Sequence, residues 1–135
     1  MQELPVSGAP GSPGALTADE KTWAALAHAT ILLAVLSAGP LGPIAAFVIW
    51  LMKQDKSPYV RRQAMQSLVY QLVAVVVSWI MWAAIGVLSM VLVGLCCIPF
   101  GLIATLFPVV YGCYAAYECS QGRDFSYWLI GDLIA

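Results

Sequence analysis

His28 is the one histidine of the chain, and it lies in a stretch from Thr22 to Met52 that contains no Asp, Glu, Lys or Arg. An imidazole within a membrane segment can relay a proton or bind a metal or haem, so His28 is a candidate functional residue. A metal or haem site needs a second strong ligand, and the apolar segments offer only Met and Cys side chains. We therefore expect a neutral His28 that hydrogen-bonds to a neighbouring helix.

Gln63, Ser67 and Gln71 recur at helical spacing, and Ser78 follows further along the same segment. Polar groups in hydrocarbon are costly unless they are paired, so this polar stripe should face protein or water. It could line a hydrophilic path for a transported substrate, or it could hold the helices together by hydrogen bonds. We favour the second interpretation.

Gly112 and Ala116 lie four residues apart, and therefore on one face of a helix. Two small residues at this spacing allow another helix to approach closely, which favours helix association in lipid. The face could serve the protein's own bundle or a partner protein, and we lean towards the partner.

The four cysteines show neither zinc-finger spacing nor a haem-attachment motif. The vicinal pair Cys96-Cys97 could be a redox pair, but cysteine in an apolar helix usually behaves as a small buried hydrophobe. The chain has no phosphate-binding loop, no nucleophile beside a base and no pair of intramembrane carboxylates. We expect no cofactor, no metal and no enzymatic activity.

The elements that position these side chains must lie in a lipid bilayer. Residues 64–117 contain no charged side chain, and the whole chain is 61% hydrophobic and only 10% charged. Ordinary globular proteins are about 25% charged, and a spanning helix needs only about 20 apolar residues. The pattern predicts an all-α fold: an integral membrane helical bundle of four helices, with a short broken first pair and then two long spans.

Capping residues, prolines and glycines set the expected boundaries. Residues 1–16 are predicted to be a flexible Pro/Gly-rich tail, residues 17–120 the transmembrane helical domain, and residues 121–135 an amphipathic interfacial segment. In the last segment, Phe125, Tyr127 and Trp128 are expected at the level of the lipid headgroups. The predicted helices cover residues 18–38, 44–53, 58–92 and 99–120, with a tight turn at 94–99.

The first pair of helices has two possible arrangements. The sequence Gly39-Pro40-Leu41-Gly42-Pro43 favours a break, because proline lacks a donor and disfavours the helical region for the residue before it. A straight helix over residues 18–52 would also be about 52 Å long, against a hydrocarbon core of about 30 Å. A hairpin is therefore expected, with a single bent span as the alternative, and the side of the membrane that holds the N-terminal tail depends on which is correct.

Basic residues predict the orientation of the protein. Five of the six basic residues lie in the loop 53–62 and at Arg123, and two spans separate these segments, so both should share one membrane face. The positive-inside rule makes that face cytoplasmic. The expected location is the bacterial inner membrane, with several spans and a cytoplasmic C-terminus. A net charge of −1 gives no polybasic patch for nucleic acid, so the expected partners are membrane lipids and other membrane protein subunits.

Three segments resemble known proteins. Residues 23–28 (WAALAH), 49–60 (IWLMKQDKSPYV) and 59–67 (YVRRQAMQS) resemble a widespread bacterial family of small membrane proteins. The family is similar to the twenty-kilodalton subunit of the chloroplast inner-envelope import translocon and to the magnetosome MamF and MmsF proteins. The resemblance covers about residues 20–135 and departs at Arg61-Arg62-Gln63, where many bacterial members carry an acid, a histidine and further charge. It implies a helical membrane fold and leaves the function open.

Two functions are consistent with these observations. The favoured one is a non-enzymatic accessory or scaffold subunit that packs against a larger membrane complex, because catalytic groups are absent and small-residue packing faces are present. The alternative is a translocation or channel component, which the import-subunit resemblance suggests. A redox or quinone-site subunit that uses His28 and the cysteines is a third, weaker option.

Overall fold

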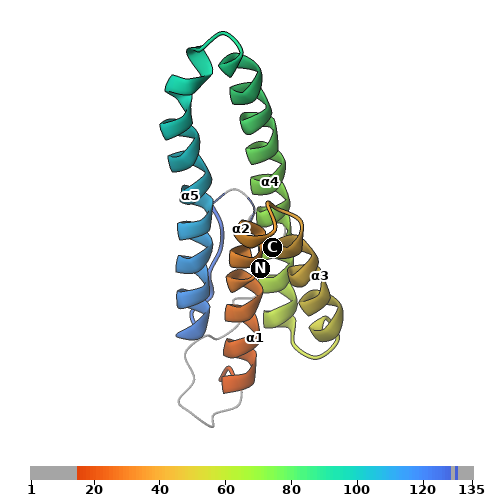
Figure 1. Cartoon of the computed structure of the whole chain (residues 1–135). Helices are drawn as coiled ribbons and strands as arrows, with labels where there is room; N and C mark the ends of the chain where they lie inside the picture. Colours follow the sequence, from red (N-terminus) through yellow and green to blue (C-terminus); the bar gives the residue numbers. More distant parts are fainter. Residues whose placement is uncertain (1–14, 129, 131–135) are drawn as a thin grey trace.

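The computed structural model describes residues 15–128 and residue 130, so most of the N-terminal tail and residues 129 and 131–135 lie outside the described part. The helices are α1 (Ala18–Ala29), α2 (Ile31–Leu36), α3 (Leu41–Lys53), α4 (Pro58–Ser89) and α5 (Val93–Ser120). No strand occurs among the described residues. Since α1 and α2 follow one another in a single column, this is the predicted all-α bundle of a broken first pair and two long helices (Figure 1).

The first column begins at the predicted capping box. The Thr17 side chain accepts from the backbone N–H of Glu20, and the Glu20 carboxylate accepts from the backbone N–H of Thr17. The column is interrupted at Thr30, whose hydroxyl donates to the Ala27 carbonyl at 2.7 Å. A hydroxyl that bonds to the preceding turn competes with the regular helix ladder. The break between α1 and α2 coincides with this bond and was not predicted from the sequence.

Helices α2 and α3 form a hairpin, as expected, and not a single bent span (Figure 1). Ala38 and Gly39 between them adopt positive φ angles of 58° and 134°, which reverses the chain. The turn lies against α4, because the indole N–H of Trp79 donates to the Ala38 carbonyl at 2.8 Å. The helix α3 starts three residues earlier than predicted and includes Pro43 in its first turn, where a missing N–H donor does no harm.

Ser57 caps α4 and Pro58 occupies its first position, as predicted. The predicted turn at 94–99 is wrong: the chain reverses between Ser89 and Val93, and Pro99 lies inside α5. Leu92 makes the reversal with a φ of 65°. Gly94 is needed for close approach, because a Cβ there would come within 2.2 Å of the Ser89 nitrogen.

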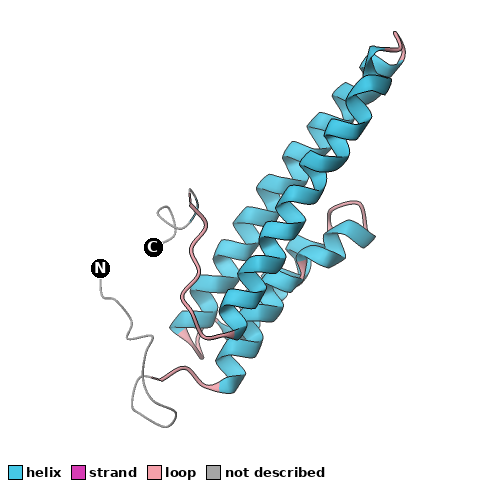
Figure 2. Cartoon of the chain, turned by 90° about the vertical axis from the view of Figure 1, so that its left-hand side faces the viewer, coloured by secondary structure: helices cyan, strands magenta, loops and turns pink. Residues whose placement is uncertain are grey.

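Helices α4 and α5 are long and apolar enough to cross a membrane. With 32 residues, α4 is about 48 Å long. The column α1–α2 and the helix α3 accompany only the lower part of this pair, so the rest of the α4–α5 hairpin projects beyond them (Figure 2). Small residues contribute to the helix contacts of the lower part: Ala24, Ala27, Ala64 and Ala115 are fully buried, which allows the close packing that holds helices together in lipid.

Charged side chains gather at one end of the bundle, which we call the polar end. It comprises the beginnings of α1 and α4, the end of α3 with the loop that follows it, and the end of α5 with residues 121–124. The charged residues of the described part all belong to it: Asp19, Glu20, Lys21, Lys53, Asp55, Lys56, Arg61, Arg62, Glu118, Arg123 and Asp124. Hydrogen bonds and ion pairs join the loop 53–62 to residues 123–124, so the expectation that both segments share one face agrees with the structure. The opposite end, the turn between α4 and α5, is called the far end.

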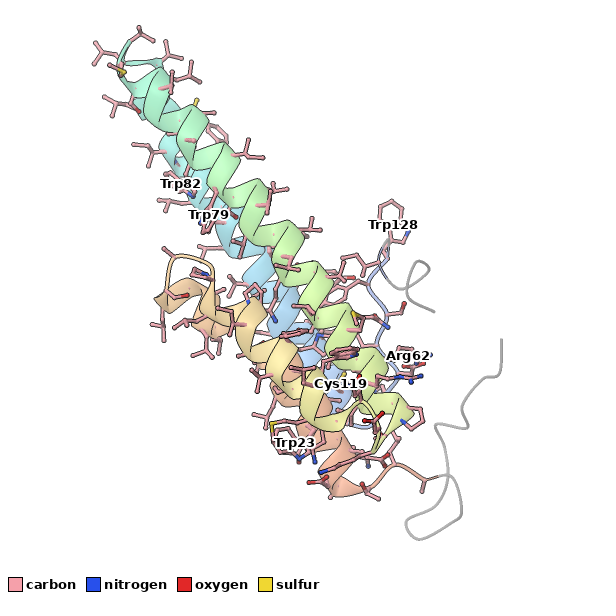
Figure 3. All side chains as sticks on the ribbon, turned by 90° about the vertical axis from the view of Figure 1, so that its right-hand side faces the viewer. Trp23, Arg62, Trp79, Trp82, Cys119 and Trp128 are labelled. Carbon is pink, nitrogen blue, oxygen red and sulfur yellow. The ribbon has the colours of Figure 1, made fainter. Side chains whose placement is uncertain are left out.

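The C-terminal segment differs from the expectation. Residues 123–127 have no regular secondary structure, and Phe125 and Tyr127 are buried against the bundle. Both aromatic rings pack inside the protein instead of facing lipid, and their position at the level of the headgroups stays a prediction. Trp128 is 81% exposed and points away from the bundle (Figure 3). Its interfacial role, and that of the residues beyond it, stays a prediction.

Candidate functional site

His28 lies at the centre of a buried polar network. Its Nδ1 is 2.9 Å from the Tyr127 hydroxyl, and its Nε2 is 3.0 Å from Oε1 of Gln63. The amide nitrogen of Gln63 donates to Oδ1 of Asp124 at 2.8 Å and to the Phe125 carbonyl at 2.9 Å. The network therefore joins α1, α4 and the C-terminal segment, and all of its hydrogen bonds to His28 come from within the chain.

The same geometry fixes the proton on His28. Two acceptors, from Asp124 and Phe125, face the Gln63 amide nitrogen, so its oxygen must be the atom that faces His28. An amide oxygen can only accept, so Nε2 of His28 carries the proton, and Nδ1 accepts from the Tyr127 hydroxyl. A neutral His28 satisfies both bonds, as expected from the sequence, although the partner at Nδ1 is an irregular segment and not a helix.

Aromatic rings hold the C-terminal segment in place around His28. Tyr127 stacks on Tyr70 with ring centroids 4.0 Å apart and an interplanar angle of 10°. Phe125 contacts Tyr127 edge to face at 4.9 Å, and Tyr111 contacts both rings in the same manner. Such pairs add about 0.5–1.5 kcal/mol each beyond simple burial. The segment is therefore part of the folded core and closes the network from one side.

The rest of the polar stripe binds the first column to α4. The Ser67 hydroxyl donates to the Ala27 carbonyl at 2.5 Å, and the Gln71 amide nitrogen donates to Thr30 Oγ1 at 2.8 Å and Ser67 Oγ at 2.7 Å. Gln63, Ser67 and Gln71 are all at most 1% exposed. These contacts support the interpretation of the stripe as interhelical hydrogen bonding.

Ionic contacts close the polar end below this network. Arg62 forms an ion pair with Asp124, which connects the start of α4 to the C-terminal segment. The Ser57 hydroxyl donates to Glu20 Oε1 at 2.6 Å. This bond, with the Thr17 backbone N–H, favours the carboxylate form and holds the pKa of Glu20 below its ordinary value. The starts of α1 and α4 are thereby tied together.

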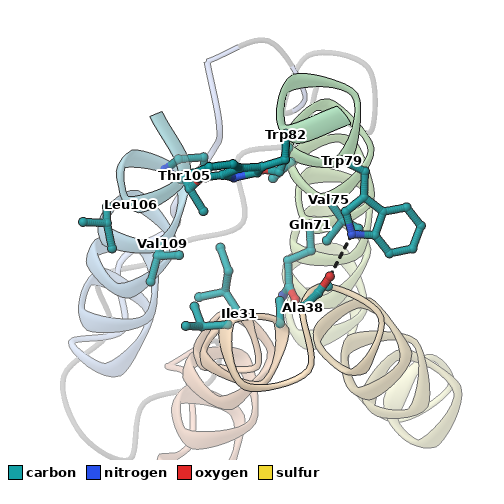
Figure 4. A pocket seen from close by; sticks show the side chains of 15 residues that line it. Ile31, Ala38, Gln71, Val75, Trp79, Trp82, Thr105, Leu106 and Val109 are labelled. Carbon is teal, nitrogen blue, oxygen red and sulfur yellow. Dashed lines mark hydrogen bonds between the residues drawn. The ribbon is translucent and has the colours of Figure 1, made fainter. Parts of the chain in front are cut away.

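A cleft lies where the α2–α3 turn meets the long hairpin, with a volume of about 350 Å³. Its walls come from α2, α4 and α5, and they are formed chiefly by apolar side chains such as Ile31, Val75, Trp82, Leu106 and Val109 (Figure 4). The volume is at the lower end of the range for small-molecule sites. The cleft contains no titratable group, so it offers a shape and no acid–base chemistry.

Neither the cysteines nor the acids form a metal site within residues 15–128 and 130. No group of three or more His, Cys, Asp or Glu side chains converges there. The four cysteines are free thiols, and Cys119 is buried with its thiol 3.5 Å from Oε1 of Gln63.

Gly112 and Ala116 are placed differently from our interpretation. A Cβ at Gly112 would come within 2.9 Å of Ile31 Cδ1, so this glycine allows α2 to pack against α5 in the same chain. Ala116 is partly buried one turn further along. The interpretation that Gly112 packs against a partner protein is therefore wrong, because the column α1–α2 of the same chain already covers this face of α5.

Two residues of the network were not predicted from the sequence as partners of His28 and Gln63: Tyr127 and Asp124. The Gln66 side chain accepts from the Tyr127 backbone N–H at 3.3 Å, and Tyr127 is ninety-nine positions from His28. No periodicity relates an irregular C-terminal segment to a helix at the other end of the chain. One sequence signal for this contact was available: Arg62 and Asp124 carry opposite charges, and in the structure they form an ion pair.

The two long apolar helices, the polar end and the buried hydrogen-bond network define a helical membrane protein. The chain belongs to the magnetosome magnetite crystal formation protein family of MamF and MmsF, whose family model matches residues 19–134. This confirms the magnetosome part of the resemblance, while the similarity to the import subunit stays a prediction. No curated protein and no solved structure matches the chain.

Proposed function

We propose that the protein is a non-enzymatic accessory or scaffold subunit of a bacterial magnetosome membrane, where it takes part in magnetite crystal formation by associating with other membrane proteins. The proposal rests on where the buried polar side chains make their hydrogen bonds. His28, Gln63 and Ser67 hydrogen-bond inside the chain, so these candidate chemical groups hold the bundle together. The protein then acts through its outer surface, which is apolar along both long helices.

A docking face for such a partner is available on the projecting part of α4. Ala83 and Gly86 are exposed and lie three residues apart, and apart from the neighbouring backbone of α4 no described atom lies within 4 Å of a Cβ placed at Gly86. Residues three apart are neighbours on one helix face, and small exposed residues there leave room for a second helix to approach closely. We place the docking face here and not at Gly112, whose face is filled by Ile31.

The proposal is tested by gentle detergent extraction and mass spectrometry of the proteins that co-purify. A double variant Ala83→Leu, Gly86→Leu should still insert, because leucine favours the bilayer, and it should lose the partners that wild type retains. Val77→Leu, at an exposed position of the same helix, is the matched control. Retention of every partner by the double variant would exclude this face, and a wild-type protein that purifies alone would contradict the scaffold function.

The translocation function is the second candidate, and the import-subunit resemblance is its motive. It requires a polar path, whereas Gln71 is 1% exposed and its amide nitrogen is bonded to Thr30 and Ser67. We expect Gln71→Leu to change bundle stability by about 1 kcal/mol or less, the usual scale for an intramembrane hydrogen bond, and to leave transport unchanged. Loss of a conductance or translocation activity in a folded Gln71→Leu protein would favour the channel function.

A further inference from the structure

The short hairpin α2–α3 ends partway along the long hairpin α4–α5, and two contacts determine the level at which it ends. Trp79 donates to the Ala38 carbonyl, and Gly39 is packed so closely on Val75 that a Cβ at Gly39 would come within 2.8 Å of it. The α2–α3 turn is therefore level with residues 75–79 of α4. Backbone that is not helical survives at membrane depth only where its polar groups are satisfied, and the Trp79 bond meets that condition for Ala38.

The depth of the turn follows from helix geometry. The uncharged part of α4 begins at Ala64, and residues 75–79 lie about 17–22 Å further along the helix at 1.5 Å per residue. From Trp79 to Ser89, α4 continues for about 15 Å without α2 or α3 beside it. The uncharged part is longer than a hydrocarbon core of about 30 Å, and a tilt of the long hairpin would accommodate the difference. The short hairpin thus reaches the middle of the bilayer and ends there.

The cross-section of the protein consequently differs between the two leaflets. In the polar-end leaflet it contains α4, α5, the α1–α2 column, α3 and the segment 123–127 (Figure 2). In the far leaflet, the described residues contribute α4 and α5 alone. Each helix with its side chains is about 10 Å across, so the column α1–α2 and α3 add roughly two helix cross-sections to one leaflet only.

The cleft marks the step between the wide and the narrow part. Its lining is chiefly apolar and includes Ala38 and Gly39 of the turn together with Trp82 and Leu106 of the long hairpin (Figure 4). At this depth the surrounding medium is hydrocarbon. Acyl chains of the far leaflet can fill the step, so the wedge shape persists for a single chain in lipid.

From this asymmetry we infer that the protein is a one-leaflet wedge that binds preferentially to strongly curved membrane, with its polar end in the convex leaflet. A convex leaflet is stretched at the level of its headgroups, so it accommodates an inserted volume with less strain than a flat or concave one. Interfacial helices that insert into one leaflet show the same sensitivity to curvature. The inference concerns one chain and its lipids, so it does not depend on the proposed protein partners.

The test measures the orientation of the full chain after reconstitution at low protein density into small sonicated vesicles and large extruded vesicles of one lipid composition. Trypsin added outside cleaves the loop 53–62 only in molecules whose polar end faces out. The ratio of outward to inward molecules should be at least about threefold higher in the small vesicles, equivalent to about 0.65 kcal/mol. Any bias from charge is common to both sizes. An equal ratio, which a second copy seated in the step would also produce, overturns the inference.

A lengthened hairpin provides the matched variant. Insertion of about two apolar helical turns after Leu36 and before Leu41 extends each arm by about 11 Å and fills the far leaflet, while the contacts at the polar end stay in place. The dependence on vesicle size should then disappear. Leu36→Ala changes the same exposed end of α2 without changing its length, and it should retain the dependence. If the lengthened protein does not fold, the comparison of the wild-type orientation ratio between small and large vesicles tests the inference by itself.

Discussion

Gln63 and His28, thirty-five residues apart, share a buried hydrogen bond of 3.0 Å that sets the orientation of both side chains. The Gln63 amide is held by Asp124 and Phe125, and it thereby determines which ring nitrogen of His28 carries the proton. A single amide therefore couples α4 to α1 and to the C-terminal segment. The candidate functional histidine and the candidate polar stripe belong to one structural unit.

Replacement of Gln63 by leucine should destabilise the bundle by about 1–3 kcal/mol, because it leaves the His28 N–H and the Phe125 carbonyl without a partner. The measurement is reversible unfolding in mixed micelles with increasing denaturing detergent. Gln121→Leu is the control, since Gln121 is exposed and its side chain has no hydrogen bond to another described residue. Equal stability of the Gln63→Leu and Gln121→Leu proteins would contradict the importance of the network.

Tyr127 should hold the C-terminal segment on the bundle chiefly through its ring. Tyr127→Ala removes the stack on Tyr70, so trypsin should cleave after Arg123 at least about tenfold faster, which corresponds to a loss of about 1.4 kcal/mol of local stability. Tyr127→Phe keeps the stack and loses only the bond to His28, so its cleavage should be much slower than that of the alanine variant. Trp128→Ala, at an exposed ring, should cleave like wild type; the same rate for Tyr127→Ala would show that the segment is held elsewhere.

Much of this fold could be predicted because a membrane restricts which structures a chain can adopt. The uncharged runs, the Thr17–Glu20 capping box and the Ser57-Pro58 step define where helices α1 and α4 begin, and the structure agrees at both places. The far turn was misplaced because Gly94 and Pro99 are typical turn residues, whereas Leu92 adopts the left-handed conformation. A leucine in that conformation has no sequence signature.

The site was predictable only in part, for a related reason. The stripe on α4 is visible in the sequence since its residues share one helix. The partners of that stripe, Tyr127 and Asp124, lie on a segment without periodicity. Gly112 was misassigned because a glycine in a helix indicates that another helix can approach closely, but it does not indicate which helix approaches. In this chain it is α2, through Ile31.

The polar end should lose stability in acid because of Glu20. Hydrogen bonds from Ser57 and Thr17 favour its carboxylate, so its pKa in the folded protein lies below the ordinary value of 4.5. A carboxyl group with a lowered pKa contributes stability that is fully present above pH 4.5 and is lost as the pH falls through the folded-state pKa. Thermal unfolding of Glu20→Gln should consequently show a flatter acid limb than wild type, with no difference in slope at neutral pH. Identical acid limbs would exclude this contribution.

The loop 53–62 and the end of α5 should be accessible from one side of the membrane, and the positive-inside rule makes that side cytoplasmic. Their proximity is fixed by the ion pair of Arg62 with Asp124. Single cysteines at Gln54 and Gln121, in a background with the native cysteines replaced, should react with a membrane-impermeant thiol reagent only after the cytoplasmic face is exposed. Labelling of the two positions from opposite faces would contradict the arrangement.

Two glycines of the long hairpin provide the sharpest test of the packing, because they differ in what surrounds them. A Cβ at Gly112 meets Ile31 within 2.9 Å, whereas one at Gly86 meets nothing within 4 Å. Gly112→Leu must therefore displace the α2 column and should destabilise the bundle by about 1–3 kcal/mol, the usual cost of overpacking. Gly86→Leu should leave stability unchanged or raise it by about 1 kcal/mol, since glycine is a poor residue inside a helix. Unfolding of both variants in the same micelles makes the comparison. If Gly112→Leu were as stable as wild type, α2 would not pack on α5 at this glycine, and the leaning towards a partner at Gly112 would be restored.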